Sequence, residues 1–477
     1  MRFEGIKKIL FVIPPSGLYR RDDRCQSKVE DQTVRIIFPP IDLTLLAAIA
    51  RQNNLQAKII DFPAESAKPQ DIKKIIEDFK PDIIFVDTTA ATLWKDLDFI
   101  SVVKKILPQT FTIAKGETLH YFYKEIFENC PDLDLVIGGE PEESFEKLIR
   151  GVEWNVIKGL IFRSDSDKSL INTGLPEPIE NLDTLPFPAR DLLNNSLYRS
   201  PETDNALTII HANRGCPARC IFCPAGKISD FKIRYRSPDN IISEIKECVE
   251  KFGIREFLFH GDTFTMKKRW VIDLCKKIVD ENLKIRWGCN SRTDTFDEER
   301  AEWMKKAGCW VVAFGVESGS QEILDKMQKG ARLESAITAV NICKKVGLRS
   351  HAFYIIGLPW ETKKTLNDTL KFAKKLDTDF FDFNIAYPLP GTELYEMAKK
   401  EKLLIRDENP FEKGGYAQAS LRTYTLDPHF LTLYRRKILL TLYCRPGYIY
   451  RTLKNAGSPK VAINYIKSAI KRFFQIV

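Results

Sequence analysis

The chain has 477 residues, of which 44% are hydrophobic and 29% are charged, and it contains 11 cysteines. This composition excludes an intrinsically disordered chain, and the length predicts two or three domains. The sequence has no apolar run long enough to predict a transmembrane helix. Cysteines that are mostly scattered singly do not resemble a secreted disulfide framework. We therefore expect a cytoplasmic protein in which clustered cysteines bind metal.

The net charge of +9 comes from the end of the chain. After Asp427, the last acidic residue, ten lysine and arginine residues follow, so residues 1–427 carry 9 − 10 = −1. An enzyme that acts on nucleic acid would more often spread its basic charge around the cleft. Nucleic acid is therefore not the expected partner.

Residues 1–150 alternate buried-strand patterns with amphipathic helical patterns. Apolar runs predict strands at 7–15, 56–62, 82–89, 111–115 and 133–139. The segments between them predict helices at 40–53, 69–79, 93–107 and 120–129. Apolar strands that alternate with helices are typical of a parallel sheet covered on both faces. We expect an α/β, doubly wound, Rossmann-like domain that binds ligands at the carboxyl ends of its strands.

A connector at 151–205 is expected to contain a small hairpin, and the alternation then restarts in a second domain at 206–400. Apolar runs predict strands at 206–212, 254–260, 284–290, 309–316, 349–357 and 380–388. Helical patterns lie between them at 238–252, 266–281, 297–307, 332–346 and 361–376. Six strands joined by helices predict a partial (βα)6 barrel or an open sheet. Right-handed crossovers would place every strand-to-helix loop on one rim.

The first of these rim loops, NRGCPARCIFCPAG, contains Cys216, Cys220 and Cys223 in a C-x₃-C-x₂-C spacing. Thiolates are soft ligands suited to iron–sulfur clusters. Structural zinc is the alternative, but it prefers four ligands in paired C-x₂-C arrangements, and no second pair is present. Three thiolates on a [4Fe–4S] cluster would leave one iron open to a substrate or cofactor.

This loop, with Phe222 before its third cysteine, resembles the signature of the radical S-adenosylmethionine (SAM) superfamily. HGDTFT (260–265), NSRTD (290–294), GVESGS (315–320) and YIIGLPWET (354–362) match further rim motifs of that superfamily in order. The resemblance implies a [4Fe–4S] cluster on the three cysteines and SAM beside Phe222, Gly261, Asp262, Arg292, Glu317 and Ile356. It also implies reductive cleavage of SAM to a 5′-deoxyadenosyl radical, with electrons from a low-potential donor such as ferredoxin or flavodoxin.

The first domain followed by such a core resembles the cobalamin-binding class of radical SAM enzymes, which includes hopanoid methylases and the anaerobic Mg-protoporphyrin monomethyl ester cyclase. The segments that carry this resemblance are 38–54, 86–93, AKGETLH (114–120), 136–149 and LPFPARDLL (185–193). It implies cobalamin near Thr88, Thr89, Gly116, Glu117, Gly139 and Glu140. A D-x-H-x-x-G motif is absent from this domain, so a histidine lower ligand is not expected. A retained but empty scaffold is the alternative, because fold alone does not establish a ligand.

Two histidines and several single cysteines remain. His211 and His260 flank the rim and are expected to support the cluster or SAM rather than to act as general bases. The cysteines at 248, 275, 289, 309 and 343 fall within helix or strand patterns and are expected to be buried apolar side chains.

Residues 401–477 predict a basic helical tail. Ile463, Ile466, Ile470 and Phe474 form an apolar stripe at helical spacing, with basic residues elsewhere. One interpretation is a helical cap on the core with a solvated basic face. The other is a surface that meets anionic lipid headgroups, which would make the protein peripheral at a membrane.

Three functions follow from these patterns. The first is a cobalamin-dependent radical SAM methyltransferase that acts on an unactivated carbon of a lipid-like or other small molecule. The second is a non-methylating enzyme of the same architecture that performs cyclisation or carbon–carbon coupling. The third is a non-catalytic iron–sulfur protein. We favour the first.

Overall fold

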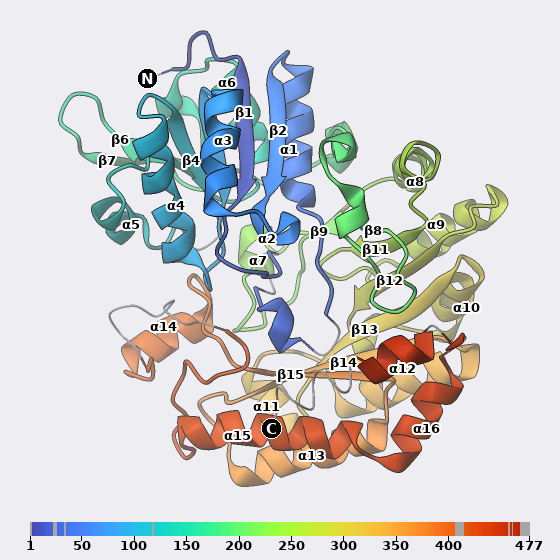
Figure 1. The fold of residues 1–477 in the computed structure, drawn as a ribbon. Helices are drawn as coiled ribbons and strands as arrows, with labels where there is room; N and C mark the ends of the chain where they lie inside the picture. Colours follow the sequence, from blue (N-terminus) through green and yellow to red (C-terminus); the bar gives the residue numbers. More distant parts are fainter. Residues whose placement is uncertain are drawn as a thin grey trace.

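The computed structural model describes residues 2–21, 26–32, 35–116, 119–405, 415–456, 458–459 and 461–467. These residues form two α/β units followed by a helical tail, which confirms the predicted fold class (Figure 1). Within these ranges, no helix combines the length and the apolar character needed to cross a membrane.

The first sheet has the strand order β2-β1-β3-β4-β5-β6-β7. Its strands are β1 (Lys8–Ile13), β2 (Gln56–Asp61), β3 (Ile83–Asp87), β4 (Phe111–Lys115), β5 (Leu135–Ile137), β6 (Leu160–Arg163) and β7 (Leu170–Asn172). The first five strands pair in parallel, and β6 and β7 pair antiparallel. The order 2-1-3-4-5 is that of a doubly wound sheet, which binds ligands where the strand order reverses. The hairpin predicted in the connector is present as β6 and β7, and it extends this sheet.

Helices cover both faces of the first sheet. They are α1 (Ile41–Gln52), α2 (Phe62–Glu65), α3 (Pro69–Phe79), α4 (Leu93–Ile106), α5 (Tyr123–Asn129) and α6 (Glu142–Ile149). Ile9 and Phe11 of β1 are buried with α1 and α6, whereas Leu10 and Val12 are buried with α3, α4 and α5. Successive strand side chains point to opposite faces, so an apolar strand such as β1 fits only a sheet buried on both sides.

The second sheet has six parallel strands in the order β15-β14-β13-β12-β11-β8. These strands are β8 (Leu207–His211), β11 (Glu256–His260), β12 (Arg286–Ser291), β13 (Cys309–Glu317), β14 (Arg349–Ile356) and β15 (Phe380–Ile385). A short antiparallel pair, β9 (Asn213–Arg214) and β10 (Arg234–Tyr235), follows β8. Because each neighbour in the sheet is the next long strand along the chain, the strand-to-helix loops lie on one rim.

The longer helices of this unit share a buried core with the sheet: α8 (Pro238–Phe252), α9 (Lys268–Asp280), α10 (Glu298–Lys306), α12 (Leu333–Val346) and α13 (Lys363–Leu376). The shorter helices α11 (Gln321–Lys326) and α14 (Glu393–Lys400) pack in a separate buried cluster, and α7 (Ala225–Ile228) follows the third cysteine of the motif. The predicted cysteines of this core, such as Cys248 and Cys289, are buried within it. Helix α8 shows why these boundaries could be predicted, because Ser237 caps its first turn and Gly253 ends it with φ of +67°.

The tail adds α15 (Pro428–Tyr443) and α16 (Pro446–Lys454). Helix α15 runs beside the edge strand β15, where Arg435 Nε donates to the carbonyl oxygen of Phe383 at 2.6 Å. The Tyr443 hydroxyl donates to the carbonyl oxygen of Phe381 at 2.7 Å. The predicted helical tail is therefore present. Ile470 and Phe474 of the predicted apolar stripe lie outside the described residues.

Candidate active site

The cysteine loop follows β8 and β9, and its backbone requires glycine at one point. Gly215 has a φ of +89°, and a Cβ atom there would overlap the carbonyl oxygen of Lys232. The Gly215 N–H donates to Asp262 Oδ2 at 2.5 Å. Glycine adopts this backbone conformation without steric cost. A hydrogen bond thus ties the residue directly before Cys216 to the segment that follows β11.

Further hydrogen bonds fix both ends of the loop. Cys216 N donates to Ser229 Oγ at 3.3 Å, and Cys216 Sγ lies 3.5 Å from Thr263 Oγ1. Between the second and third cysteines, Ile221 N donates to the carbonyl oxygen of Met327 at 3.1 Å. The loop is therefore held by α7, by the segment after β11 and by the end of α11.

All three thiols line one cavity at the carboxyl ends of the second sheet. Its empty volume, including the part open to solvent, is about 1220 Å³. The predicted site residues that line it are Cys216, Cys220, Cys223, Phe222, Asp262, Arg292 and Glu317. The structure therefore brings most of the residues predicted for the cluster and SAM to one place. We call this space the rim cavity.

Two residues predicted beside SAM are not among those that line the rim cavity. Gly261 instead leaves room for Asn213, because a Cβ atom at Gly261 would overlap the Asn213 amide. Ile356 is buried in the core between the sheet and its helices, whereas Phe353 and Ile355 line the cavity. Alternate residues of a strand face opposite sides, which explains the difference. A role of Gly261 and Ile356 in SAM binding stays a prediction.

The polar wall of the rim cavity contains a buried ion pair. Lys329 Nζ lies 2.8 Å from Glu317 Oε1, and both side chains are buried. Burial alone would lower the pKa of Lys329, but the neighbouring Glu317 carboxylate holds it above its usual value. Arg292 is bonded to Asp294 at 2.6 Å and to the carbonyl oxygen of Lys329 at 2.8 Å. Opposite charges are therefore available here for the amine and carboxylate of a ligand.

A second cavity lies between the two α/β units, and we call it the interface cleft. Its empty volume, including the part open to solvent, is about 1340 Å³. Gly139 and Glu140 are the residues predicted for cobalamin that line it. Arg20, Ala225 and Asp262 line both the interface cleft and the rim cavity. The two spaces therefore adjoin.

The other residues predicted for cobalamin do not line the cleft or lie outside the described residues. Thr88 Oγ1 donates to the carbonyl oxygen of Lys115 at 2.9 Å, and Gly116 packs against Thr88. Thr89 Oγ1 lies 2.8 Å from Thr92 Oγ1. These threonines are buried and shape the ends of β3 and β4. Glu117 lies outside the described residues.

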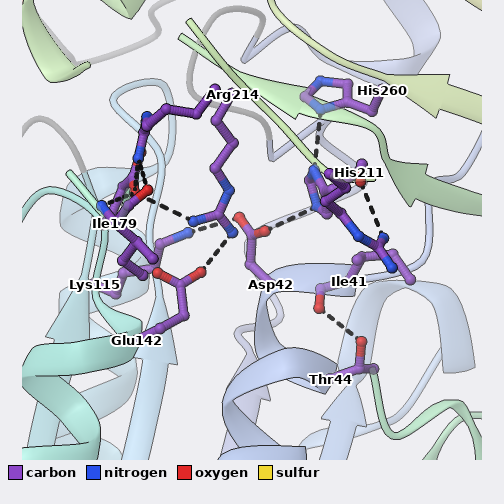
Figure 2. A network of polar contacts seen from close by, with 12 residues as sticks. Ile41, Asp42, Thr44, Lys115, Glu142, Ile179, His211, Arg214 and His260 are labelled. Carbon is purple, nitrogen blue, oxygen red and sulfur yellow. Dashed lines mark hydrogen bonds and ion pairs between the residues drawn. The ribbon is translucent and has the colours of Figure 1, made fainter. Parts of the chain in front are cut away.

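A polar network crosses the interface cleft (Figure 2). Asp42, at the start of α1, lies 2.9 Å from Lys115 Nζ and 3.2 Å from His211 Nε2. The Nδ1 atoms of His211 and His260 lie 3.3 Å apart. Burial would raise the pKa of Asp42, but Lys115 and His211 hold it well below its usual value. The Asp42 carboxylate of the first unit thus contacts His211 of the second unit, and His211 in turn contacts His260.

Two glutamates of the first unit contact arginines of the second beside this network. Glu140 bonds Arg234 at 2.9 and 2.5 Å, and Glu142 bonds Arg214 at 2.6 Å. Although burial alone would raise the pKa of Glu140, the bonds from Arg234 and the charge of Arg214 hold it below its usual value. Glu140, which was predicted to contact cobalamin, is thus also a link between the units.

The interface cleft contains buried polar atoms that lack a hydrogen-bond partner within the described chain. Both amide atoms of Asn213 and the Oε2 atom of Glu142 belong to this class, although each side chain is at most 3% exposed. Unpartnered buried polar groups are costly, so they indicate a ligand or ordered water. Cobalamin presents amide groups around its corrin ring, and the donors and acceptors of the cleft fit that chemistry.

The donor set on the cysteine loop likewise fits an iron–sulfur cluster. In the described ranges, no three His, Cys, Asp or Glu side chains are arranged around a single metal ion. A cluster places its thiolate ligands on different iron atoms, so it does not require such an arrangement. The three cysteines are neither fully buried nor paired in disulfides, and they face a cavity that can hold a ligand of the open iron.

Several residues of both spaces were not predicted as site residues. Lys329 lies after α11 in a segment without a recognisable motif. Asn213 and Arg214 directly precede the cysteine motif, and Glu142 lies two residues after Glu140, so proximity to a motif was the available signal. Asp42 gave no local signal, because its role depends on contacts with the second unit.

Comparison with known proteins agrees with this geometry. The family model of the radical SAM superfamily matches residues 210–373, and the model of the B12 binding domain matches residues 29–149. An uncharacterized methyltransferase of Pyrococcus horikoshii is 33% identical over 94% of this chain and 95% of its own length. The anaerobic magnesium-protoporphyrin IX monomethyl ester cyclase of Rubrivivax gelatinosus is 24% identical over 92% of this chain and 80% of its own.

Solved structures show the same fold. The cobalamin-dependent S-adenosylmethionine radical enzyme OxsB, with aqua-cobalamin and S-adenosylmethionine bound, superposes with a TM-score of 0.72. It is 17% identical, with 98% of this chain and 72% of that chain covered. The cofactors of this chain are accordingly a [4Fe–4S] cluster, SAM and cobalamin. The chain belongs to the radical SAM enzymes that carry an N-terminal B12 binding domain.

Proposed function

We propose that the protein is a cobalamin-dependent radical SAM methyltransferase that methylates an unactivated carbon of a lipid-like or other small molecule. The observation that carries this proposal is the contact between the two cavities. Asp262 lines both, and its carboxylate also binds the backbone of the cysteine loop. A methyl donor in the interface cleft would therefore lie beside the space where SAM is cleaved.

The residues of the chain bind and orient these groups. Cys216, Cys220 and Cys223 would hold the cluster, and Arg292 with Glu317 would contact SAM. When bound, the cluster and SAM supply a radical that abstracts hydrogen, and cobalamin supplies the methyl group. Asn213, Glu140 and Glu142 would contact cobalamin at the edge of the interface cleft.

An apolar wall of the rim cavity supports a substrate with a large apolar surface. Phe353, Ile355 and Leu389 contribute carbon atoms to this wall. Tyr387 lies beside them, and its buried hydroxyl has no hydrogen-bond partner within the described chain. Ligand sites combine apolar walls with a few polar groups that set orientation. This composition suits a small molecule with a hydrogen-bonding group near Tyr387.

The proposal includes the partners and the location of the enzyme. Radical SAM enzymes need an electron donor, and we propose a low-potential carrier such as ferredoxin or flavodoxin. We place the enzyme in the cytoplasm, with a peripheral contact between its basic tail and a membrane surface.

A second candidate is a cyclisation or carbon–carbon coupling without methyl transfer. The relative from Rubrivivax gelatinosus favours it, because a cyclase is similar to this chain over 92% of its length. SAM that is isotopically labelled in its methyl group separates the two candidates. The reduced holoenzyme is incubated with labelled SAM and a small-molecule extract of the source cells. Labelled product with deoxyadenosine supports methylation, and deoxyadenosine with a new unlabelled product contradicts it.

A further inference from the structure

Helix α16 exposes an unusual group of large apolar side chains. Ile449, Tyr450 and Leu453 are 46%, 68% and 37% exposed. Leu453 lies four residues after Ile449 and three after Tyr450, and side chains at these spacings are neighbours on a helix surface. Other exposed apolar residues, such as Val156 and Val279, occur singly on different elements. Single exposed apolar residues are ordinary, whereas a contiguous group indicates a contact surface.

The exposed group is held in place by the opposite side of α16. Tyr448 is 6% exposed, and its hydroxyl donates to the carbonyl oxygen of Asp379 at 2.5 Å. Arg445 and Arg451 both bond Asp377, at 3.0 and 2.9 Å. Burial would raise the pKa of Asp377, but the two arginines hold it below its usual value. The apolar side chains of α16 therefore project from a fixed helix rather than from a loose end.

The surroundings of this face are basic. Lys454 and Lys467 are exposed and have no carboxylate partner within the described chain. The next segment is joined to α16 through Arg349, which bonds both the Tyr465 hydroxyl, at 2.6 Å, and the carbonyl oxygen of Asn455. Ile463 and Ile466 of that segment are also exposed. We call Ile449, Tyr450, Leu453 and Lys454 the α16 face.

The position of the α16 face relative to the cavities is fixed by the strands. Asp379, which accepts the Tyr448 hydroxyl, immediately precedes β15, and Arg349 is the first residue of β14. The α16 face therefore lies at the amino ends of the strands, on the side of the core away from the first unit (Figure 1). Both cavities lie at the carboxyl ends.

We propose that the α16 face binds the surface of an anionic lipid bilayer and leaves both cavities open to the aqueous phase. This rests on the peripheral contact in the proposed function, and it names the residues, the lipid charge and the orientation. Apolar and tyrosine side chains enter the boundary between headgroups and acyl chains, and lysines pair with anionic headgroups. Bound in this way, the enzyme is retained at the membrane while SAM enters from water.

Sedimentation of the full chain with vesicles tests the proposal. One vesicle type contains phosphatidylcholine alone, and the other contains phosphatidylcholine with phosphatidylglycerol. We expect binding to the anionic vesicles that weakens with salt, and little binding to the neutral ones. A Tyr450→Ser/Leu453→Ser double variant should bind about tenfold more weakly, and Lys454→Glu should lower binding by a smaller factor.

Val156→Ser is the matched control, because Val156 is as exposed as Tyr450 but lies in the first unit. It should bind like the parent chain. Equal binding by the double variant would overturn the proposal, as would the absence of binding to anionic vesicles. Light scattering adds a second readout, because a dimer that the double variant dissociates would assign the α16 face to a second copy instead. Binding needs no turnover, so its failure is distinct from a failure of methyl transfer.

The orientation has a separate readout. Vesicle-bound holoenzyme should cleave SAM that is added to the water phase at the rate of the free enzyme. A large loss of cleavage on anionic vesicles, with the rate of the double variant unchanged, would show that the cavities face the bilayer and would contradict the proposed orientation.

Discussion

The cysteine loop and the interface cleft are built in opposite ways. The cluster ligands lie within eight consecutive residues, and one glycine and a few backbone hydrogen bonds hold them. The interface cleft is assembled from residues far apart in the chain, such as Asp42 with His211 and Glu142 with Arg214. A local motif is thus enough for one site, whereas the other exists only after the two units meet.

This difference implies that the two sites fail differently. Loss of a ligand in the cysteine loop should remove the cluster without separating the units. Loss of a contact across the interface should weaken cobalamin binding while the cluster remains. The following variants test this separation.

The largest effect is expected from replacing Cys216, Cys220 and Cys223 together by Ala. Without thiolates the cluster has no ligands, so iron content and SAM cleavage should both fall to background. Iron analysis and the release of deoxyadenosine measure these changes, and cobalamin uptake should persist. Cys248→Ala, a buried cysteine of α8, is the control and should keep both iron and cleavage. Retained SAM cleavage in the triple variant would refute the assignment of the cluster.

Arg214→Met should weaken the contact between the two units and leave the cluster in place. Its loss leaves the buried carboxylate of Glu142 without its partner, which typically costs about 3–5 kcal/mol. Thermal unfolding and the cobalamin retained after desalting should both decrease, with iron content kept. Arg150→Met is the matched control, because its partner Glu146 is exposed and such pairs contribute about 0–1 kcal/mol. A variant that loses iron but retains cobalamin would contradict the expectation that this change affects the interface cleft and not the cluster.

Asn213→Ala sharpens the assignment of the interface cleft. The Asn213 amide has no partner within the described chain, so its removal should leave thermal stability unchanged or slightly higher. If the amide binds cobalamin, the affinity for cobalamin should fall by about tenfold. This loss corresponds to one hydrogen bond between uncharged groups, of about 1 kcal/mol or more. Asn195→Ala should behave oppositely, because its amide bonds the carbonyl oxygen of Arg190 at 2.9 Å. An Asn213→Ala variant that is less stable but binds cobalamin normally would contradict this role.

The smallest effect is expected on the pH dependence of stability and concerns Glu361. This residue follows β14 in the chain and is not among the described residues that line either cavity. Burial raises the pKa of this carboxyl from its ordinary value of about 4.5 to about 8. Between these values the folded chain keeps a proton that the unfolded chain has lost, so stability should fall as pH rises from about 5 to 8.

Glu361→Gln should flatten this dependence and raise the unfolding midpoint at pH 8 relative to the parent. Three to four pKa units correspond to at most about 5 kcal/mol. Thermal unfolding at several pH values measures the slope, and Glu322→Gln, an exposed acid of α11, should leave it unchanged. An identical slope in Glu361→Gln would show that the carboxyl ionises normally.

The sequence was sufficient to predict the elements of both sheets within a few residues. Long apolar runs, clear helical periodicity and caps such as Ser237 and Gly253 act locally, so a single sequence contains them. The cysteine loop could be predicted for the same reason. By contrast, the pairing of Asp42 with His211 depends on how two units pack, and no local pattern encodes that.

Some predicted site residues do not line the cavities, for similar physical reasons. Ile356 is expected beside SAM, and its neighbour Ile355 lines the rim cavity, because successive residues of a strand face opposite sides. Thr88 lies at the predicted strand end, and its hydroxyl donates to the carbonyl oxygen of Lys115. The roles of both residues stay predictions. Lys329 became visible as a site residue only through its contact with Glu317.

The most direct test of two adjoining cofactor sites is a metal analysis of the chain purified without oxygen and then reconstituted with iron, sulfide and cobalamin. We predict about four iron atoms and one cobalt atom per chain, with the absorbance of both cofactors in one spectrum. Iron near four per chain with no uptake of cobalamin would contradict the account, because the interface cleft would then not be a cobalamin site.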